Sequence, residues 1–153
     1  MQTFEYPNLV SGTDGGAGFS DNASFDGRTV TNQNSTNVES SISFPAIALT
    51  TGESYTLSFD FCKDSITSDE TIDVYMLDRK LTDAEKLRYS MLVTTEWHHY
   101  EHTFIPSDGG DWSYTRFRID NNKTGTLHVR DIMLAAGEIA RAWAPAAGEV
   151  WPE

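Results

Sequence analysis

Gly125–Glu149 reads GTLHVRDIMLAAGEIARAWAPAAGE, and this stretch decides the fold class that we expect for the chain. Its first part, Thr126 to Leu134, alternates with the period of two that is typical of a β-strand. One side of this strand carries Leu127, Val129 and Asp131, and the other carries His128, Arg130 and Ile132. The alternation blurs after Asp131, as expected of a final strand that is covered on both sides. From about residue 137 to 153 a tail rich in Gly, Ala, Pro and Trp either packs on the domain or leads to a neighbour.

The rest of the chain shows the same β pattern. Further strands are expected at residues 27–31, 38–44, 54–62, 72–77 and 114–120, and Asn32–Asn34 reads as a turn. About eight strands, separated by Gly- and Asp-rich turns, predict an all-β fold with two antiparallel sheets packed as a sandwich. The predicted core contains Tyr55, Leu57, Phe59, Phe61, Val74, Phe104, Phe117, Ile119, Leu127 and Val129.

One short helix is predicted at residues 82–88, TDAEKLR. Thr82 and Glu85 have the spacing of a capping box, and Ala84 and Leu87 are good helix formers. Nothing between the two ends of the chain has the composition of a linker. We therefore expect one domain over residues 1–153.

Composition restricts the partners. The 11 basic and 23 acidic residues give a net charge of −12, which argues against binding of nucleic acid or of an anionic membrane. No apolar run is long enough to insert into a membrane, and Met1–Phe4 does not resemble the start of a signal peptide. Cys62 is the single cysteine, so no disulfide forms within the chain. We expect synthesis in the cytoplasm without a signal peptide.

Neither a zinc site nor an enzyme is expected. His98 and His102 would suit zinc on a helix, but Trp97–Phe104 is β-favouring, and four residues of strand span about 13 Å. Glycoside hydrolysis needs two carboxyl groups about 5 to 10 Å apart, and among so many acidic residues the pattern selects no pair. No nucleophile motif or phosphate-binding glycine loop is present either.

Four segments, in order, resemble a known family. Asn8–Thr13 reads NLVSGT, Gly52–Phe61 reads GESYTLSFDF, Trp97–Phe104 reads WHHYEHTF, and the strand end Met133–Leu134 is followed by the Ala142–Ala146 tail, AWAPA. Together they are similar to the carbohydrate-binding-module-like jelly rolls of bacteriophage tail and baseplate proteins. The resemblance covers nearly the whole chain, but Gly15–Phe19 departs from the aromatic-rich segment that often follows the opening.

The resemblance implies a galactose-binding-like jelly roll and, often in this family, a structural calcium between the opening loop and the last strand. The matching positions here are Asp131 and Asp14. A calcium ion takes six to eight oxygen ligands at about 2.3 to 2.6 Å, so loop carbonyls would complete the site. The alternative is that Asp131 accepts hydrogen bonds from loop amides.

A saccharide site is predicted on one outer sheet surface. It combines an aromatic platform with charged hydrogen-bonding groups, namely Trp112, Tyr114, Arg116, Arg118, Tyr75 and Asp60. The two arginines add a preference for acidic or phosphorylated polymers. Two alternatives stay open: Trp112 folds back over the edge of the sandwich, and the arginines pair with Asp60, Asp73 or Asp120 across strands.

Two functions follow from the resemblance. One is a non-catalytic virion domain of the tail that binds host-surface polysaccharide. The other is a structural decoration or spacer domain of the virion without sugar binding. Either would contact other virion or tail proteins, and a homo-oligomer would agree with the rings of copies in which tail proteins usually assemble.

Overall fold

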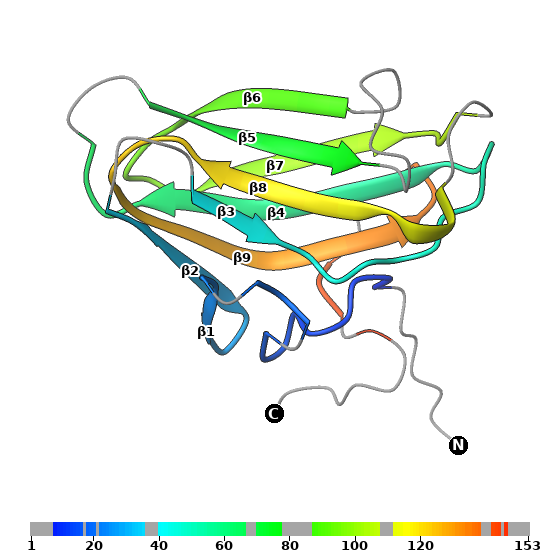
Figure 1. The fold of residues 1–153 in the computed structure, drawn as a ribbon, viewed down its shortest axis with the longest axis horizontal. Coiled ribbons are helices and arrows are strands. Elements are labelled where there is room, and N and C mark those ends of the chain that lie inside the picture. Colours follow the sequence, from blue (N-terminus) through cyan, green and yellow to red (C-terminus); the bar gives the residue numbers. More distant parts are fainter. Residues whose placement is uncertain are drawn as a thin grey trace.

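The computed structural model describes residues 8–16, 18–20, 22–35, 40–66, 70–77, 87–107, 112–138, 142–144 and 146. Its strands form two antiparallel sheets packed face to face (Figure 1). The five-stranded sheet has the order β1 (Ser24–Asp26), β2 (Thr29–Asn34), β9 (Gly125–Ala136), β4 (Tyr55–Lys63) and β7 (His98–Phe104). The four-stranded sheet has the order β3 (Ser40–Ser43), β8 (Arg116–Asn121), β5 (Glu70–Leu77) and β6 (Leu87–Val93). The predicted all-β sandwich is confirmed.

The core lies between the sheets because alternate residues of β4, β5, β8 and β9 are apolar and point the same way. Phe59 is 1% exposed and stacks on Tyr100 with ring centroids 4.7 Å apart. All ten predicted core residues are buried. The strand register derived from the sequence is therefore confirmed for these positions.

One irregularity in β9 corrects the expected alternation. Asp131 has φ 56°, and the pairing of β4 with β9 shifts between Ser58 and Asp60. This is a β-bulge, which adds one residue and reverses the side on which the following residues lie. Ile132, expected on the outer side, is consequently 1% exposed in the core, whereas the Asp131 side chain, expected to lean inward, remains 35% exposed.

Two further expectations are wrong. Asn32–Asn34 is part of β2, where it pairs with Leu127, Thr126 and Gly125, because β9 supplies a partner that outweighs turn propensity. Leu87 and Arg88, the end of the expected helix, belong to β6 and pair with β5. Residues 82–86 lie outside the described part of the chain. Within that part the one helix is a 3₁₀ turn, Trp112–Tyr114, and no helix there could span a membrane.

The described segments nearest the two chain ends, residues 8–16 and residues 142–144 with 146, lie on the same side of the molecule. Asn8 and Ala146 form a parallel bridge, and the Leu9 amide donates to the Leu134 carbonyl at 2.7 Å. Trp143 is buried, and its Nε1 donates to Thr13 Oγ1 at 3.0 Å. These segments lie alongside β9, away from β6 (Figure 1). They therefore pack against the five-stranded sheet without being strands of it.

Candidate functional site

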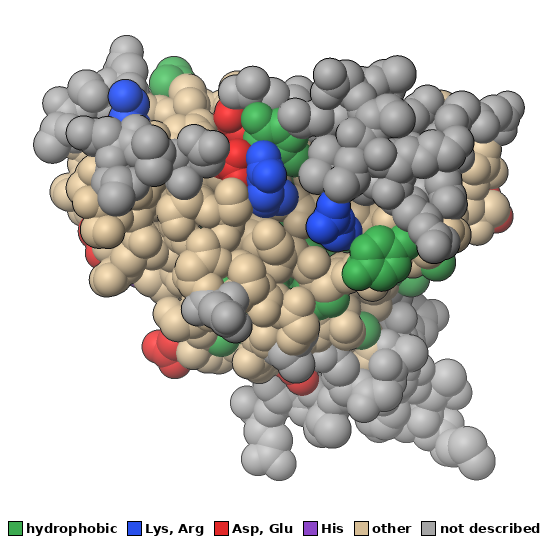
Figure 2. Space-filling view, viewed as in Figure 1, with side chains coloured by type: hydrophobic (Ala, Val, Ile, Leu, Met, Phe, Trp, Pro, Cys, Tyr) green, Lys and Arg blue, Asp and Glu red, His purple; other side chains and the backbone are tan. Residues whose placement is uncertain are grey.

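The candidate site lies on the outer face of the four-stranded sheet. Phe117 and Ile119 of β8 point into the core, so the residues between and beside them point outward. The register of β8 places Arg118 between Tyr75 of β5 and Ser43 of β3. We call this surface the arginine face and define it by Ser43, Tyr75, Tyr114, Arg116, Arg118 and Asp120. Figure 2 shows basic side chains there, next to acidic and apolar ones.

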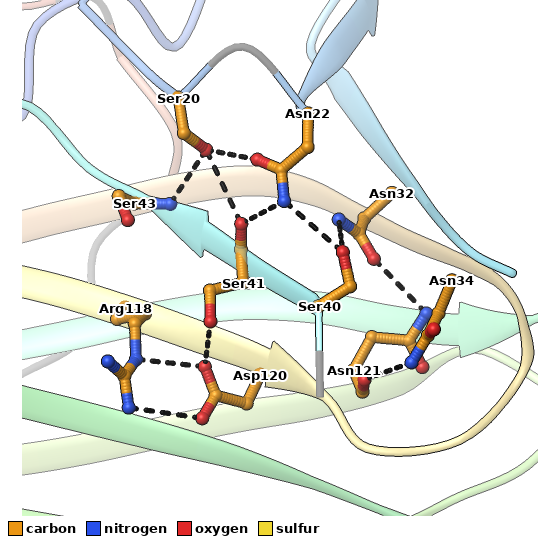
Figure 3. A network of polar contacts seen from close by, with 10 residues as sticks. All are labelled: Ser20, Asn22, Asn32, Asn34, Ser40, Ser41, Ser43, Arg118, Asp120 and Asn121. Carbon is orange, nitrogen blue, oxygen red and sulfur yellow. Dashed lines mark hydrogen bonds and ion pairs between the residues drawn. The ribbon is translucent and has the colours of Figure 1, made fainter. Parts of the chain in front are cut away.

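Arg118 is held in one position. Its Nε lies 2.9 Å from Asp120 Oδ1, and Nη2 donates to Oδ2 at 3.2 Å. The guanidinium carbon lies 4.4 Å from the centre of the Tyr75 ring, and Ser41 donates to Asp120 at 2.6 Å (Figure 3). Two parallel contacts to one carboxylate combine charge with fixed geometry. Arg118 thus pairs with Asp120, one of the expected partners, but the pair lies within β8 rather than across strands.

Arg116 is in a different state. Its side chain is exposed and forms no ion pair or hydrogen bond with any residue that the structure describes. A hollow of about 110 Å³ is lined by Arg116, Arg118, Phe117 and Ser43. The Ser43 amide donates to Ser20 Oγ at 3.0 Å, which ties this end of β3 to the loop before β1 (Figure 3). One side of the hollow is therefore fixed by a hydrogen bond. Arg116 contributes a positive charge that no described acidic side chain neutralises.

Tyr114 supplies the exposed aromatic ring of this face. It is 53% exposed and ends the 3₁₀ turn that precedes β8. An exposed tyrosine offers an apolar ring and a hydroxyl to a ligand. Of the two aromatic residues predicted for the platform at this end of β8, Tyr114 is the accessible one.

Trp112 does not have the exposure that the sequence suggested. It is 3% exposed in the apolar core, and its Nε1 donates to the Ser107 carbonyl at 2.9 Å. The 3₁₀ turn directs the indole inward, and the Leu49 amide donates to the Trp112 carbonyl at 2.9 Å. Trp112 therefore folds back over the sandwich, as the alternative held. Tyr75 is also largely covered, at 7% exposure, and supports Arg118 from below.

Asp60 is not on the arginine face. It belongs to β4, in the other sheet, where its carboxylate lies 2.8 Å from His99 Nδ1 and 3.2 Å from Arg130 Nε. Alternation correctly predicted that Asp60 points away from the core. It could not show which sheet β4 joins, because that depends on pairing with β7 and β9.

The outer face of the five-stranded sheet carries an exposed aromatic residue, Trp97, that was not among the predicted site residues. Trp97 is 39% exposed, and the Arg130 guanidinium lies 4.0 Å from its ring centre. Asp60 joins Arg130 to His99, and His99 Nε2 lies 3.2 Å from Glu101. The hydrogen bond with Asp60 raises the pKa of His99 above its usual value. The only sequence signal was the position of Trp97 directly before a strand.

The histidines lie on a strand, as predicted. His98, His99 and His102 all belong to β7, and His102 points inward with Tyr100 and Phe104. Burial lowers the pKa of His102, so the neutral imidazole is favoured there. Among the described residues no three His, Cys, Asp or Glu side chains could hold a metal ion together.

Asp131 has a partner other than calcium. Its Oδ1 lies 3.2 Å from Arg28 Nε, and Arg28 stacks on Trp143 at 4.3 Å from the ring centre. Asp14 lies in the turn at residues 11–15. Calcium at Asp131 and Asp14 stays a prediction, which a melting curve with and without chelator tests, together with the Asp131→Ala variant.

Comparison with known proteins gives structural matches only. No family model matches the sequence, and no curated protein matches it. A CBM4 structure has a TM-score of 0.62 and 18% identity over 84% of this chain and 84% of its own. The CBM22-1 xylan-binding domain of Paenibacillus barcinonensis Xyn10C has a TM-score of 0.61 and 9% identity over 90% of this chain and 100% of its own.

A virion protein has the same fold. The tripod (BppUct-A-L) from the baseplate of bacteriophage Tuc2009 has a TM-score of 0.62 and 16% identity, over 97% of this chain and 63% of that one. At such identities these likenesses show the fold alone.

Proposed function

We propose that this chain is a non-catalytic carbohydrate-binding domain whose ligand lies on the arginine face. The observation that carries the proposal is the hollow lined by Arg116 and Arg118, on the strand that follows the exposed Tyr114 in the chain. The fold supports it, because several structures that share it are described as carbohydrate-binding modules. Fold alone does not imply function, so the argument depends on the chemistry of this face.

The groups on this face suit a sugar chain. A sugar ring has an apolar C–H side that an exposed tyrosine can cover, and hydroxyls at its edge that a guanidinium and a serine hydroxyl can bind. Arg118 is already held by Asp120 and Tyr75, so little side-chain entropy is lost on binding.

The biological setting that we propose is the virion of a bacteriophage, where the domain would bind host-surface polysaccharide. The baseplate neighbour supports this setting, as do the opening and closing motifs of the sequence. The second candidate is a structural decoration or spacer of the virion. The same baseplate neighbour favours it, since a baseplate tripod is itself part of a particle.

Titration with host wall polysaccharide separates the two candidates. Tyr114→Ala should weaken binding at least tenfold, about 1.4 kcal/mol, because a stacking surface is lost. Trp97→Ala is the matched control, since it removes an exposed aromatic ring from the opposite sheet. Flat isotherms of the unaltered protein against every host fraction would favour the spacer. Equal loss in both variants would place the ligand elsewhere.

A further inference from the structure

The two arginines of the arginine face differ in whether an acidic side chain lies against them. Asp120 Oδ1 and Oδ2 both face Arg118, and the Asp120 side chain is 3% exposed. This pair is close to neutral as a unit, and it presents hydrogen-bond donors rather than a free charge. Arg116 has no such carboxylate among the described residues, and its cross-strand neighbour on β5 is the uncharged Leu77.

A cation beside a hollow is an anion-binding arrangement. Guanidinium binds carboxylate and phosphate through two parallel hydrogen bonds, and it remains charged at any physiological pH. The hollow of about 110 Å³ lies between Arg116 and the fixed Arg118, with Ser43 at its rim. One acidic group placed there would meet Arg116 as its counter-ion, with donors from two further side chains around it.

We propose that Arg116 alone selects an anionic saccharide, by binding a carboxylate or phosphate group of the polymer, while Arg118, neutralised by Asp120, contributes hydrogen-bond donors without this charge preference. The inference rests on the proposed saccharide-binding function and narrows its ligand. Of the two arginines expected to prefer acidic polymers, the structure thus assigns that preference to one.

The net charge of the whole protein predicts a salt dependence that differs between the unaltered protein and the Arg116 variant. A net charge of −12 repels a polyanion at long range, and salt screens this repulsion. The contact with Arg116 is an attraction at short range, which salt weakens. The Arg116→Gln variant retains only the repulsion, so its residual affinity for an anionic polymer should rise with salt, whereas that of the unaltered protein should fall or stay constant.

Calorimetric titration with three probes tests the proposal: polygalacturonate, the same polymer after carboxyl reduction, and a poly(glycerol phosphate). Arg116→Gln should weaken binding of an anionic probe at least tenfold and that of the neutral probe less than twofold. The two anionic probes distinguish a carboxylate from a phosphate ligand. Arg116→Lys should restore part of the affinity, because the charge returns without the planar fork.

Two controls separate charge from structure. Arg130→Gln removes the same charge from the opposite sheet and should leave binding unchanged. Arg118→Gln should lower the melting temperature, because it leaves the covered Asp120 without its cation. Melting temperatures that are lowered by Arg116→Gln and unchanged by Arg118→Gln would reverse the assigned roles and overturn the proposal.

The remaining outcomes are also decisive. Neutral and anionic probes bound equally well, with no effect of Arg116→Gln, would overturn the inference and leave the saccharide-binding function standing. If no probe and no host polysaccharide binds, both fail. A loss of the same size for all three probes would show that Arg116 binds hydroxyl groups rather than an acidic group.

Discussion

The interior between the sheets has two ends that are built differently. At the end that contains Phe59, Phe104 and Phe117, aromatic rings pack with centroids about 5 to 6 Å apart. At the other end Lys63 is 1% exposed, and its ammonium lies 2.6 Å from Glu70 Oε2 and 3.1 Å from Asn121 Oδ1. The two ends are equally buried, so burial alone does not require apolar residues when every polar group finds a partner.

The polar end joins both sheets through a chain of hydrogen bonds. Asn121 at the end of β8 donates to Asn32 Oδ1 of β2 at 3.2 Å and to the Gly125 carbonyl at 3.1 Å. Asn34 Nδ2 donates to the Asn121 carbonyl at 2.8 Å (Figure 3). The ammonium of Lys63 also reaches the carbonyls of residues 123 and 124. Such networks depend on exact partners, whereas apolar packing tolerates exchange of similar shapes.

The apolar end should show the largest response to truncation. Phe59→Ala should lower the free energy of unfolding by about 3 to 5 kcal/mol, because it leaves a cavity beneath Tyr100. Phe59→Leu, which keeps most of the volume, should cost much less. Chemical denaturation measures both. A loss below about 1 kcal/mol for the alanine variant would contradict the central place of Phe59 in the core.

The polar end should lose stability when Lys63 alone is replaced, and it should regain much of that stability when Glu70 is replaced as well. Lys63→Met should cost about 3 to 5 kcal/mol, since Glu70 is left buried without its cation. Lys63→Met with Glu70→Leu should recover much of this loss, because no charge remains buried. If the double variant were as unstable as the single one, the ion pair would not be the reason for the loss.

A variant of Asn32 tests the hydrogen bonds that this side chain makes in the same network. Asn32→Ala removes the acceptor of the Asn121 amide and the donor to Ser40 Oγ, which lies 3.0 Å away. A buried amide without a partner costs about 1 to 3 kcal/mol. Gln33→Ala, at an exposed position of the same strand, is the control and should change the free energy of unfolding by less than about 0.5 kcal/mol. Equal effects would mean that Asn32 contributes only strand propensity.

The smallest expected effect compares the outer and inner faces of β7 through two histidines. The pKa of His99 is raised because its protonated ring interacts with Asp60. This interaction stabilises the fold fully below about pH 6.5, and its contribution is lost as pH rises through the folded-state pKa. The lowered pKa of His102 acts in the opposite sense, because its contribution is present above about pH 6.5 and is lost as pH falls through the folded-state pKa.

Melting curves between pH 5 and 8 for His99→Gln and His102→Gln measure these slopes. Relative to the unaltered protein, His99→Gln should be least stable at low pH. The deficit of His102→Gln should instead shrink as pH falls. Parallel curves for the two variants would show that the faces of β7 do not differ in their preference for the imidazolium form.

Alternation in the sequence was sufficient to predict much of the fold. The period of two in β4, β5, β7, β8 and β9 predicted the sandwich and the ten core residues, because a strand must direct alternate side chains to opposite faces. The same rule showed that Arg116, Arg118 and Asp60 point outward. These conclusions depend only on the local geometry of each strand.

Tertiary structure alone decided the rest. Pairing with distant strands placed Asp60 in one sheet and the arginines in the other. The bulge at Asp131 returned Ile132 to the core, and the turn before β8 buried Trp112. Lys63 ends its strand and looks like a surface residue in sequence, yet Glu70 and Asn121 reach it from other strands. Each of these outcomes depends on partners far along the chain, and the period of one strand contains no information about them.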